Sequence, residues 1–337
     1  MRNLKIALFL TVLAGVALPA SISAKCFIFV HGHNSSNLTY QQARDYWKSG
    51  SRDMAGLIGA NNQFYIVNWN STVYYWDGAI EVAGKINNAL AGNADPGGNK
   101  CLAGETSYIV VAHSMGNTVM DYILGNSRST DPYYNYGGAN FANIGSKVTA
   151  YASVQGAHRG TVAADGICGN SSWWMNLISG IVGVFMGSSC DNGTASLQTA
   201  DSWQVKTYAN GPRVTANLIV GWEMIFGSSA LLSGEDDGLL AYPSTLACSG
   251  SATASLSQTS NCLNTEKQEV SGFKNCDQGD ENHDDGRNDA DRDVRKALTG
   301  GCWGTYTNGQ QVRSSMSAAE LIRCIWSTKP AGDTSCD

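Results

Sequence analysis

Ser114 stands between small residues, in a stretch whose residue types suit a serine nucleophile. The run Tyr108–Ala112 is apolar and strand-like, while apolar residues recur at helical spacing over Thr118–Leu124. A serine at a sharp strand-to-helix turn has a strained backbone, so the positions two before and two after it must be small. Ala112 and Gly116 meet that need. The pattern predicts a nucleophilic serine, with an ordinary Ser-Gly turn as the alternative.

A serine hydroxyl becomes a nucleophile when a histidine takes its proton and a carboxylate orients that histidine. In the α/β-hydrolases, whose nucleophile occupies a turn similar to this one, the acid and then the histidine follow the serine along the chain. Of the five histidines, only His283 follows both Ser114 and a plausible acid. We assign that acid to Asp237, although Asp236 or Glu235 could hold the same role.

Strand-like segments stand before both of these residues. Val214–Val220 precedes Asp237, and Lys267–Lys274 precedes His283. We therefore expect the loop after each strand to bring its polar side chain to the serine. A solvated acidic loop is the alternative for each, because both residues have acidic neighbours.

The negative oxygen of a tetrahedral intermediate needs backbone N–H donors that are already in place. An apolar strand beginning at Phe27 runs into the turn His31-Gly32-His33, so the amide of His33 can point at the site. The amide of Met115, directly after the serine, gives a second donor. His31 and His33 could instead bind zinc, but they would need further ligands, and no suitable carboxylate or histidine follows nearby.

Together, these motifs resemble the secreted bacterial triacylglycerol lipases of the α/β-hydrolase fold, over about residues 27–293. The matching landmarks are His31-Gly32, the turn at Ser114, Gly156–Thr161, Asp237–Leu239 and Asn282-His283. The resemblance implies an α/β fold with a mostly parallel, doubly wound sheet and a lid-like apolar insertion. It implies a secreted serine carboxylester hydrolase, a lipase or lipase-like esterase, that works through an acyl-enzyme and requires no cofactor.

The resemblance also assigns individual roles. It implies Ser114 as the nucleophile, Asp237 as the acid and His283 as the base. The amides of His33 and Met115 form the implied oxyanion hole.

Three departures from the family pattern leave every catalytic group in place. Ala112 replaces a glycine, Asn117 stands where a second glycine is frequent, and the proline before His158 is missing. His158 falls at a family histidine that is not the base, which favours a structural role. Asp285 matches one calcium-ligand position of some of these lipases, so it is a candidate ligand of a structural calcium. A solvated acidic loop is the alternative.

An apolar segment, residues 172–186, lies between Cys168 and Cys190, where the resembled lipases carry their lid. We place this lid or cap region at about residues 162–200. Its side chains could cover an acyl pocket and contact a lipid surface. A buried helix is the alternative. The candidate substrate-contacting residues are Trp173, Trp174, Leu177 and Phe185.

Residues 1–24 have the parts of a cleaved signal peptide. Arg2 and Lys5 carry positive charge, an apolar stretch too short to span a bilayer follows, and small residues precede Lys25. We expect a secreted or periplasmic protein, in which the ten cysteines favour disulfides. The simplest closures join Cys168 with Cys190, Cys248 with Cys262, and Cys324 with Cys336.

The formal net charge of −6 becomes more negative without the leader's two cations, which argues against a nucleic-acid partner. Strand-like and helix-like segments alternate from Phe27 to Val220, which indicates one α/β domain over residues 25–337. Residues 242–265 are rich in Ser, Thr and Ala, so we expect a surface insertion there. The expected partner is a lipid or other ester substrate, and the sequence identifies no steric chaperone.

Other functions fit the same residues. The catalytic residues could act on a phospholipid or a polyester, or transfer the acyl group to an acceptor other than water, as an acyltransferase does. A secreted binding protein could keep the fold without catalysis. The presence of a serine, an acid and a histidine in catalytic order argues against it, because an unused site would be free to lose them.

Overall fold

The computed structural model describes residues 25–49, 52–59, 63–102, 107–169, 189–199, 215–221, 239–240, 242–245, 274–279, 283, 301–302, 318–319 and 322. The predicted signal peptide, residues 1–24, lies outside these ranges. The same holds for Cys248, Cys262, Cys324 and Cys336, whose predicted pairings stay predictions.

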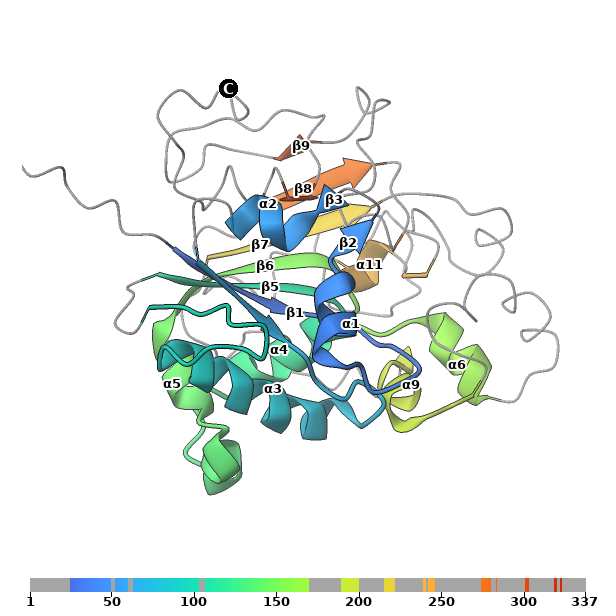
Figure 1. Cartoon of the computed structure of the whole chain (residues 1–337). Coiled ribbons are helices and arrows are strands. Elements are labelled where there is room, and N and C mark those ends of the chain that lie inside the picture. The colour runs from blue at the N-terminus through green and yellow to red at the C-terminus, as the bar shows by residue number, and fades with distance from the viewer. Residues whose placement is uncertain are drawn as a thin grey trace, which may run out of the picture.

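A seven-stranded sheet lies at the centre of the described part of the chain (Figure 1). Its strand order is β4-β1-β5-β6-β7-β8-β9, and all neighbours are parallel except β8 and β9. The predicted α/β class with a mostly parallel sheet is therefore confirmed. The strands are β1 (Cys26–Val30), β4 (Gln63–Val67), β5 (Tyr108–Ser114), β6 (Val148–Gly156), β7 (Thr215–Gly221), β8 (Lys274–Gly279) and β9 (Gly301–Cys302).

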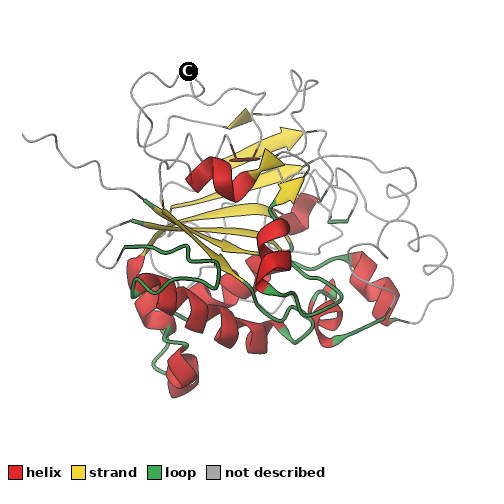
Figure 2. Cartoon of the chain, viewed as in Figure 1, coloured by secondary structure: helices red, strands yellow, loops and turns green. Residues whose placement is uncertain are grey.

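Helices α3, α4 and α5 pack on one face of the sheet, while α1 and α2 pack on the other (Figures 1 and 2). A separate hairpin pairs β2 (Lys48–Ser49) with β3 (Arg52–Asp53). Among the described helices, none has the length and apolarity that a membrane span requires. The helical elements are α1 (Tyr40–Asp45), α2 (Met54–Gly59), α3 (Tyr75–Leu90), α4 (Met115–Gly125), the 3-10 helix η1 (Pro132–Gly138), α5 (Phe141–Lys147), α6 (Val162–Cys168), α9 (Asn192–Ser196) and α11 (Tyr242–Thr245).

Successive residues of strand β1 enter two different cores. Ile28 and Val30 pack in the core under α3, α4 and α5, whereas Phe27 and Phe29 pack with α1 and α2. Side chains alternate between the two faces of a strand, so a strand covered on both faces must be apolar throughout. The sheet is therefore a buried platform, and the loops at its strand ends can hold polar side chains at fixed positions.

Several elements differ from the predicted ones. Strand β8 begins at Lys274, whereas the predicted strand ends there. Helix α4 follows Ser114 directly and starts three residues before the predicted helix. The sequence pattern does not predict α1, which is too short to show a helical period. A capping box starts α1: the Thr39 hydroxyl accepts from the Gln42 amide, and the Gln42 side chain accepts from the Thr39 amide.

The segment predicted as a surface insertion, 242–265, has two buried residues near its start. Ser244 and Thr245 are buried in α11. The Ser244 hydroxyl accepts from the Arg159 amide (3.1 Å) and donates to the Gly160 carbonyl (2.7 Å). The prediction of a surface location is thus wrong for Ser244 and Thr245, and the Ser244 hydroxyl satisfies two buried backbone groups. Residues 246–265 lie outside the described ranges.

Two disulfides are present in the described part. Cys168 and Cys190 form the bridge that the sequence predicts. The second bridge joins Cys26 to Cys101, a pairing that the sequence analysis does not include. The second pairing joins the first residue of β1 to a segment 75 residues later.

Candidate active site

Ser114 has the strained backbone that its sequence neighbours predict. It is the last residue of β5, α4 begins at Met115, and its φ of 53° and ψ of −128° lie in a region that non-glycine residues rarely adopt. A Cβ atom on Gly116 would lie 2.6 Å from the Val30 carbonyl oxygen and 2.7 Å from that of His31. The small residue two positions after the serine is therefore required, because β1 passes directly beside the turn.

Asn117 fixes the turn from inside. Its side-chain nitrogen lies 3.1 Å from the Ala112 carbonyl oxygen, 3.2 Å from that of Ser114 and 3.3 Å from that of Val154. The side chain is fully buried, and its oxygen accepts from the Tyr151 hydroxyl. The sequence marks Asn117 only as a departure from the family pattern. The structure makes it a bridge between β5, the serine turn and β6.

His283, the candidate base, lies beside the residue that precedes the nucleophile. The rings of His113 and His283 are 4.7 Å apart between centroids, and His113 Nε2 lies 2.7 Å from the His283 carbonyl oxygen. His283 is 4% exposed and Ser114 is 6% exposed. After β8, which lies later than expected, the chain thus returns to the residue that precedes Ser114.

Tyr46 links the His113 ring to the backbone of Gly32. The Gly32 N–H donates to the Tyr46 hydroxyl (3.1 Å), which lies 2.6 Å from His113 Nδ1. A hydroxyl that donates to Nδ1 leaves the proton of a neutral imidazole on Nε2, which then donates to the His283 carbonyl. Sequence reasoning missed Tyr46 and His113, because 67 residues separate them.

Asp237, the candidate acid, lies outside the described residues. Two residues later, Leu239 is buried, and its carbonyl oxygen accepts from the Thr161 hydroxyl (2.6 Å). Thr161 follows the carboxyl end of β6, so the chain just after Asp237 is anchored near that edge of the sheet. The candidate lid residues Trp173, Trp174, Leu177 and Phe185 and the candidate calcium ligand Asp285 also lie outside the described ranges.

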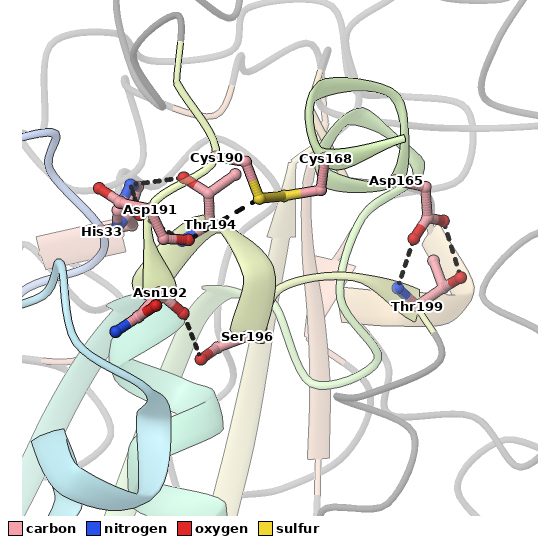
Figure 3. Close-up of a disulfide and its surroundings, with 9 residues drawn as sticks. All are labelled: His33, Asp165, Cys168, Cys190, Asp191, Asn192, Thr194, Ser196 and Thr199. Atoms are coloured by element: carbon pink, nitrogen blue, oxygen red, sulfur yellow. Dashed lines mark hydrogen bonds and ion pairs between the residues drawn. A yellow bond between two sulfur atoms is a disulfide. The ribbon is translucent and has the colours of Figure 1, made fainter. Parts of the chain in front are cut away.

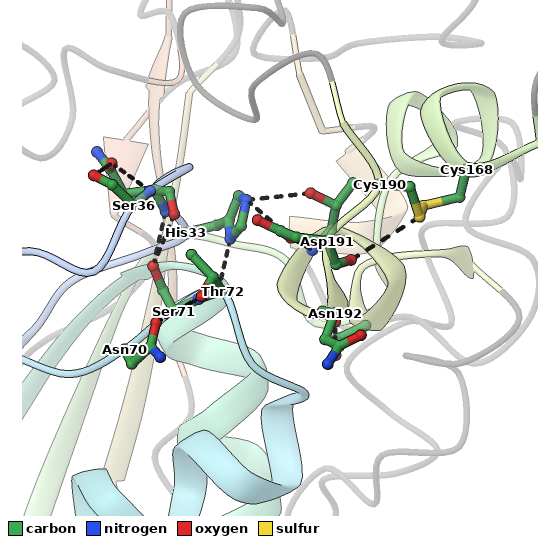
Figure 4. Close-up of polar contacts among 12 residues, drawn as sticks. His33, Ser36, Asn70, Ser71, Thr72, Cys168, Cys190, Asp191 and Asn192 are labelled. Atoms are coloured by element: carbon green, nitrogen blue, oxygen red, sulfur yellow. Dashed lines mark hydrogen bonds and ion pairs between the residues drawn. A yellow bond between two sulfur atoms is a disulfide. The ribbon is translucent and has the colours of Figure 1, made fainter.

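The turn that carries the candidate oxyanion amide packs directly on the nucleophile. A Cβ on Gly32 would lie 2.6 Å from the Ser114 Cβ, so only a glycine allows this approach. The next residue, His33, is 7% exposed. Its ring lies between Ser71 and Thr194, with Nδ1 2.8 Å from the Ser71 carbonyl oxygen and Nε2 3.2 Å from the Thr194 hydroxyl (Figures 3 and 4).

His31 and His33 do not share partners, which disfavours the zinc alternative. His31 stacks on Trp69, donates from Nδ1 to the Gly32 carbonyl (2.8 Å) and accepts at Nε2 from the Trp69 amide (3.2 Å). Burial lowers the pKa of His31 to about 4, so its imidazole is neutral. Within the described ranges, no three histidine, cysteine or carboxylate side chains gather as a metal site would require.

His158 belongs to a second Ser-His-Asp arrangement that solvent does not reach. Its Nδ1 lies 2.5 Å from the Asp121 carboxylate, and its Nε2 lies 2.8 Å from the Ser153 hydroxyl. All three residues are 0% exposed. This geometry fits the structural role favoured from the sequence, since the side chains connect α4, β6 and the loop after β6.

No protein-family model matches this sequence, and no curated protein sequence matches it. Among solved structures, EstA from Clostridium botulinum is similar with a TM-score of 0.50 and 13% identity, over 85% of this chain and 88% of that chain.

Two further structures are similar with lower scores. The Staphylococcus hyicus lipase has a TM-score of 0.47 and 15% identity, over 80% of this chain and 91% of that one. The mature Bacillus licheniformis lipase BlEst2 has a TM-score of 0.46 and 16% identity, over 78% of this chain and 86% of that one. The fold assignment rests on the Clostridium structure, and identities this low bear on the fold alone. The chain is thus α/β-hydrolase-like in fold, which confirms at that level the predicted resemblance to bacterial lipases and esterases.

Proposed function

We propose that the chain is a secreted serine carboxylester hydrolase, a lipase or lipase-like esterase with a doubly wound α/β-hydrolase fold. The observation that carries this proposal is the positive φ of Ser114 at a strand-to-helix turn, where the ring of the preceding residue, His113, contacts the ring of His283. A backbone strain of this kind persists where the surroundings impose it, and it occurs mainly at functional sites. The disulfides suit an oxidising compartment.

The reaction begins when the Ser114 hydroxyl oxygen attacks the carbonyl carbon of an ester. His283 takes the hydroxyl proton, and Asp237 orients the imidazole. The carbonyl oxygen becomes an oxyanion, which the amides of His33 and Met115 stabilise. When the tetrahedral intermediate collapses, the C–O bond to the alcohol breaks, and His283 returns the proton to the leaving alcohol. An acyl-serine remains.

Water then releases the acid. His283 takes one proton from the water while the oxygen attacks the acyl carbon, and the second tetrahedral intermediate collapses by breaking the bond to Ser114. The proton returns to the serine oxygen. The segment between Cys168 and Cys190 is the proposed lid, whose apolar residues would cover the acyl chain. Asp285 remains a candidate calcium ligand, and no step of this mechanism passes through a metal.

A comparison of ester substrates tests the proposal. Purified mature protein and Ser114→Ala are assayed with p-nitrophenyl esters of short and long acids, a triacylglycerol emulsion and a phospholipid. Turnover of long-chain esters that is lost in Ser114→Ala supports a lipase, and turnover of short-chain esters alone supports an esterase. Product analysis would reveal phospholipid cleavage, polyester cleavage or acyl transfer instead. Turnover that survives in Ser114→Ala would overturn the serine mechanism.

A further inference from the structure

We propose that Thr194, on helix α9, is a positioning residue that holds the oxyanion-hole residue His33 for catalysis. The inference rests on the proposed function, because the role of the His33 amide is part of that function. Thr194 acts through His33 and has no assigned contact with substrate. Its residue number is 161 positions away from that of His33, and the fold brings the two side chains together.

The His33 ring has a hydrogen-bond partner at each of its two nitrogens. Nδ1 lies 2.8 Å from the Ser71 carbonyl oxygen, which can only accept, so Nδ1 carries the proton (Figure 4). Nε2 lies 3.2 Å from the Thr194 hydroxyl, which can donate a hydrogen bond to this nitrogen or accept one from it. The ring is thus held at both nitrogens, by one group from the loop after β4 and one from α9.

Gly193 brings the backbone of α9 against the same ring. A Cβ at this position would lie 2.0 Å from the Ser71 carbonyl oxygen and 2.8 Å from His33 Nδ1. The Gly193 N–H donates to the Thr72 carbonyl (3.0 Å). The contact between α9 and His33 is therefore a packed one, and a side chain larger than hydrogen at Gly193 would push the two apart.

Helix α9 is itself anchored at both ends. At its end, the Ser196 hydroxyl accepts from the Tyr75 amide (3.0 Å). At its start, the Asp191 carboxylate accepts from the Thr194 amide (2.6 Å), and the preceding residue, Cys190, is bonded to Cys168 of α6 (Figure 3). A short helix held in this way is a rigid support for the imidazole.

The Thr194 hydroxyl is within hydrogen-bond distance of the His33 ring, whereas the nearby Asp191 carboxylate is not. The Asp191 carboxylate lies 3.8 Å from His33 Nε2, which exceeds hydrogen-bond distance, and one of its oxygens already caps α9. Donors stabilise a transition state when they are in place before the charge develops. A fixed imidazole restricts the backbone of its own residue, so α9 preorganises the amide of His33.

Three variants test the inference. Thr194→Val removes the hydroxyl at constant shape, and Thr194→Ser keeps it. The matched control is Thr199→Val, because the Thr199 hydroxyl donates to Asp165 (2.7 Å) and not to His33. Loss of a whole oxyanion donor lowers kcat by about 100- to 1,000-fold, so we expect a loosened donor to lower it by roughly 10-fold. KM should change little, and Thr194→Ser should restore kcat.

A double-mutant cycle separates positioning from general stability. In a His33→Ala background, which retains the backbone amide, Thr194→Val should no longer lower kcat, because its partner is absent. Thermal unfolding of each variant identifies any loss of folded protein. If Thr194→Val and Thr199→Val have equal kcat, or if Thr194→Val keeps its full effect in the His33→Ala background, the inference is overturned. The proposed function fails separately, if Ser114→Ala retains turnover.

Discussion

The Nε2 atom of His113 lies 2.7 Å from the backbone carbonyl oxygen of His283. His113 immediately precedes the candidate nucleophile, so one hydrogen bond joins the strained turn to the segment that carries the candidate base. The geometry of both is therefore coupled. A displacement of His113 would move Ser114, its neighbour in the chain, and would also move His283 through this hydrogen bond.

Tyr46→Phe tests this coupling. The change removes the hydroxyl beside His113 Nδ1, so the imidazole loses the partner that keeps its proton on Nε2. We expect a roughly 10-fold lower kcat, since small displacements of reacting groups cost up to about 100-fold. The free energy of unfolding should fall by about 1–3 kcal/mol, as for a buried polar atom left unpaired.

Tyr40→Phe is the control for this prediction. The Tyr40 hydroxyl donates to Asp95 (2.9 Å) and accepts from Asn99 (2.8 Å), so its loss should lower stability with no change in kcat. Steady-state kinetics and chemical denaturation of both variants measure the difference. Equal kcat values for the two variants would mean that the His113 contact does not position the base.

Two glycines should respond in opposite ways to substitution by alanine. In Gly116→Ala the new methyl would meet the Val30 and His31 carbonyls at 2.6 and 2.7 Å, so the turn must shift. We expect a loss of about 1–3 kcal/mol in unfolding free energy, together with loss of turnover. Gly84, inside α3, has nothing within 4 Å of such a methyl.

Gly84→Ala should therefore raise the unfolding free energy by about 0.5–1 kcal/mol, because alanine restricts the unfolded chain more than glycine does. Urea denaturation and ester hydrolysis of both variants provide the measurements. An active Gly116→Ala enzyme would show that the close approach of β1 to the turn is unnecessary.

His31 makes the stability of the fold depend on pH. Burial lowers its pKa from 6.5 to about 4, so the unfolded chain binds a proton more readily than the folded chain between these values. The stability that the neutral ring provides is complete above about pH 6.5 and is lost as the pH falls toward 4. This lowering of the His31 pKa corresponds to about 3 kcal/mol of unfolding free energy.

His31→Gln removes the titrating group. We expect the unfolding free energy of the variant to fall less steeply between pH 6.5 and 4 than that of the wild type, even if it is lower at pH 7. Denaturation curves at several pH values give both slopes. Identical slopes would show that His31 does not titrate in this range.

The Cys168 to Cys190 bridge should affect both stability and activity. It closes a loop of 22 residues, and such a loop contributes about 3 kcal/mol to stability by chain entropy. The double variant Cys168→Ala/Cys190→Ala should lose about this amount and, because α9 follows Cys190, should also lower kcat. Cys26→Ala/Cys101→Ala is the matched control.

We expect this control to lose about 4 kcal/mol, because its loop is longer at 75 residues. Its kcat should stay unchanged in the fraction that remains folded, since that bridge ties the start of β1. Unfolding curves and active-site titration measure both quantities. A kcat that falls equally in both double variants would contradict a specific link between the first bridge and the site.

Local sequence patterns predict strands β1, β5 and β7 and the serine turn. Strands β1 and β5 are buried on both faces, so most of their residues are apolar and stand out in the sequence. The turn at Ser114 is marked by its small neighbours, which a close approach of backbones demands. These features depend on residues a few positions apart.

The supports of the site depend on distant contacts, and no local pattern reveals them. Tyr46 reaches His113 across 67 residues, and Thr194 reaches His33 across 161. The Asp121 partner of His158 lies on α4, where it occupies a helix position like any other polar residue. The strand before His283 is shifted because β8 (KNCDQG) is short and largely polar, with no alternation that predicts a strand.

The most direct test of the account is to identify the serine that an active-site probe modifies. Two serines of the described residues are compared: Ser114 at the strained turn, and Ser153, whose hydroxyl lies 2.8 Å from His158 but is fully buried. The protein is treated with a fluorophosphonate, and the modified peptide is found by mass spectrometry in the wild type, Ser114→Ala and Ser153→Ala. We predict labelling of Ser114 in the wild type and in Ser153→Ala, and none in Ser114→Ala. Labelling that persists in Ser114→Ala, or that falls on Ser153, would contradict the assignment of Ser114 as the nucleophile.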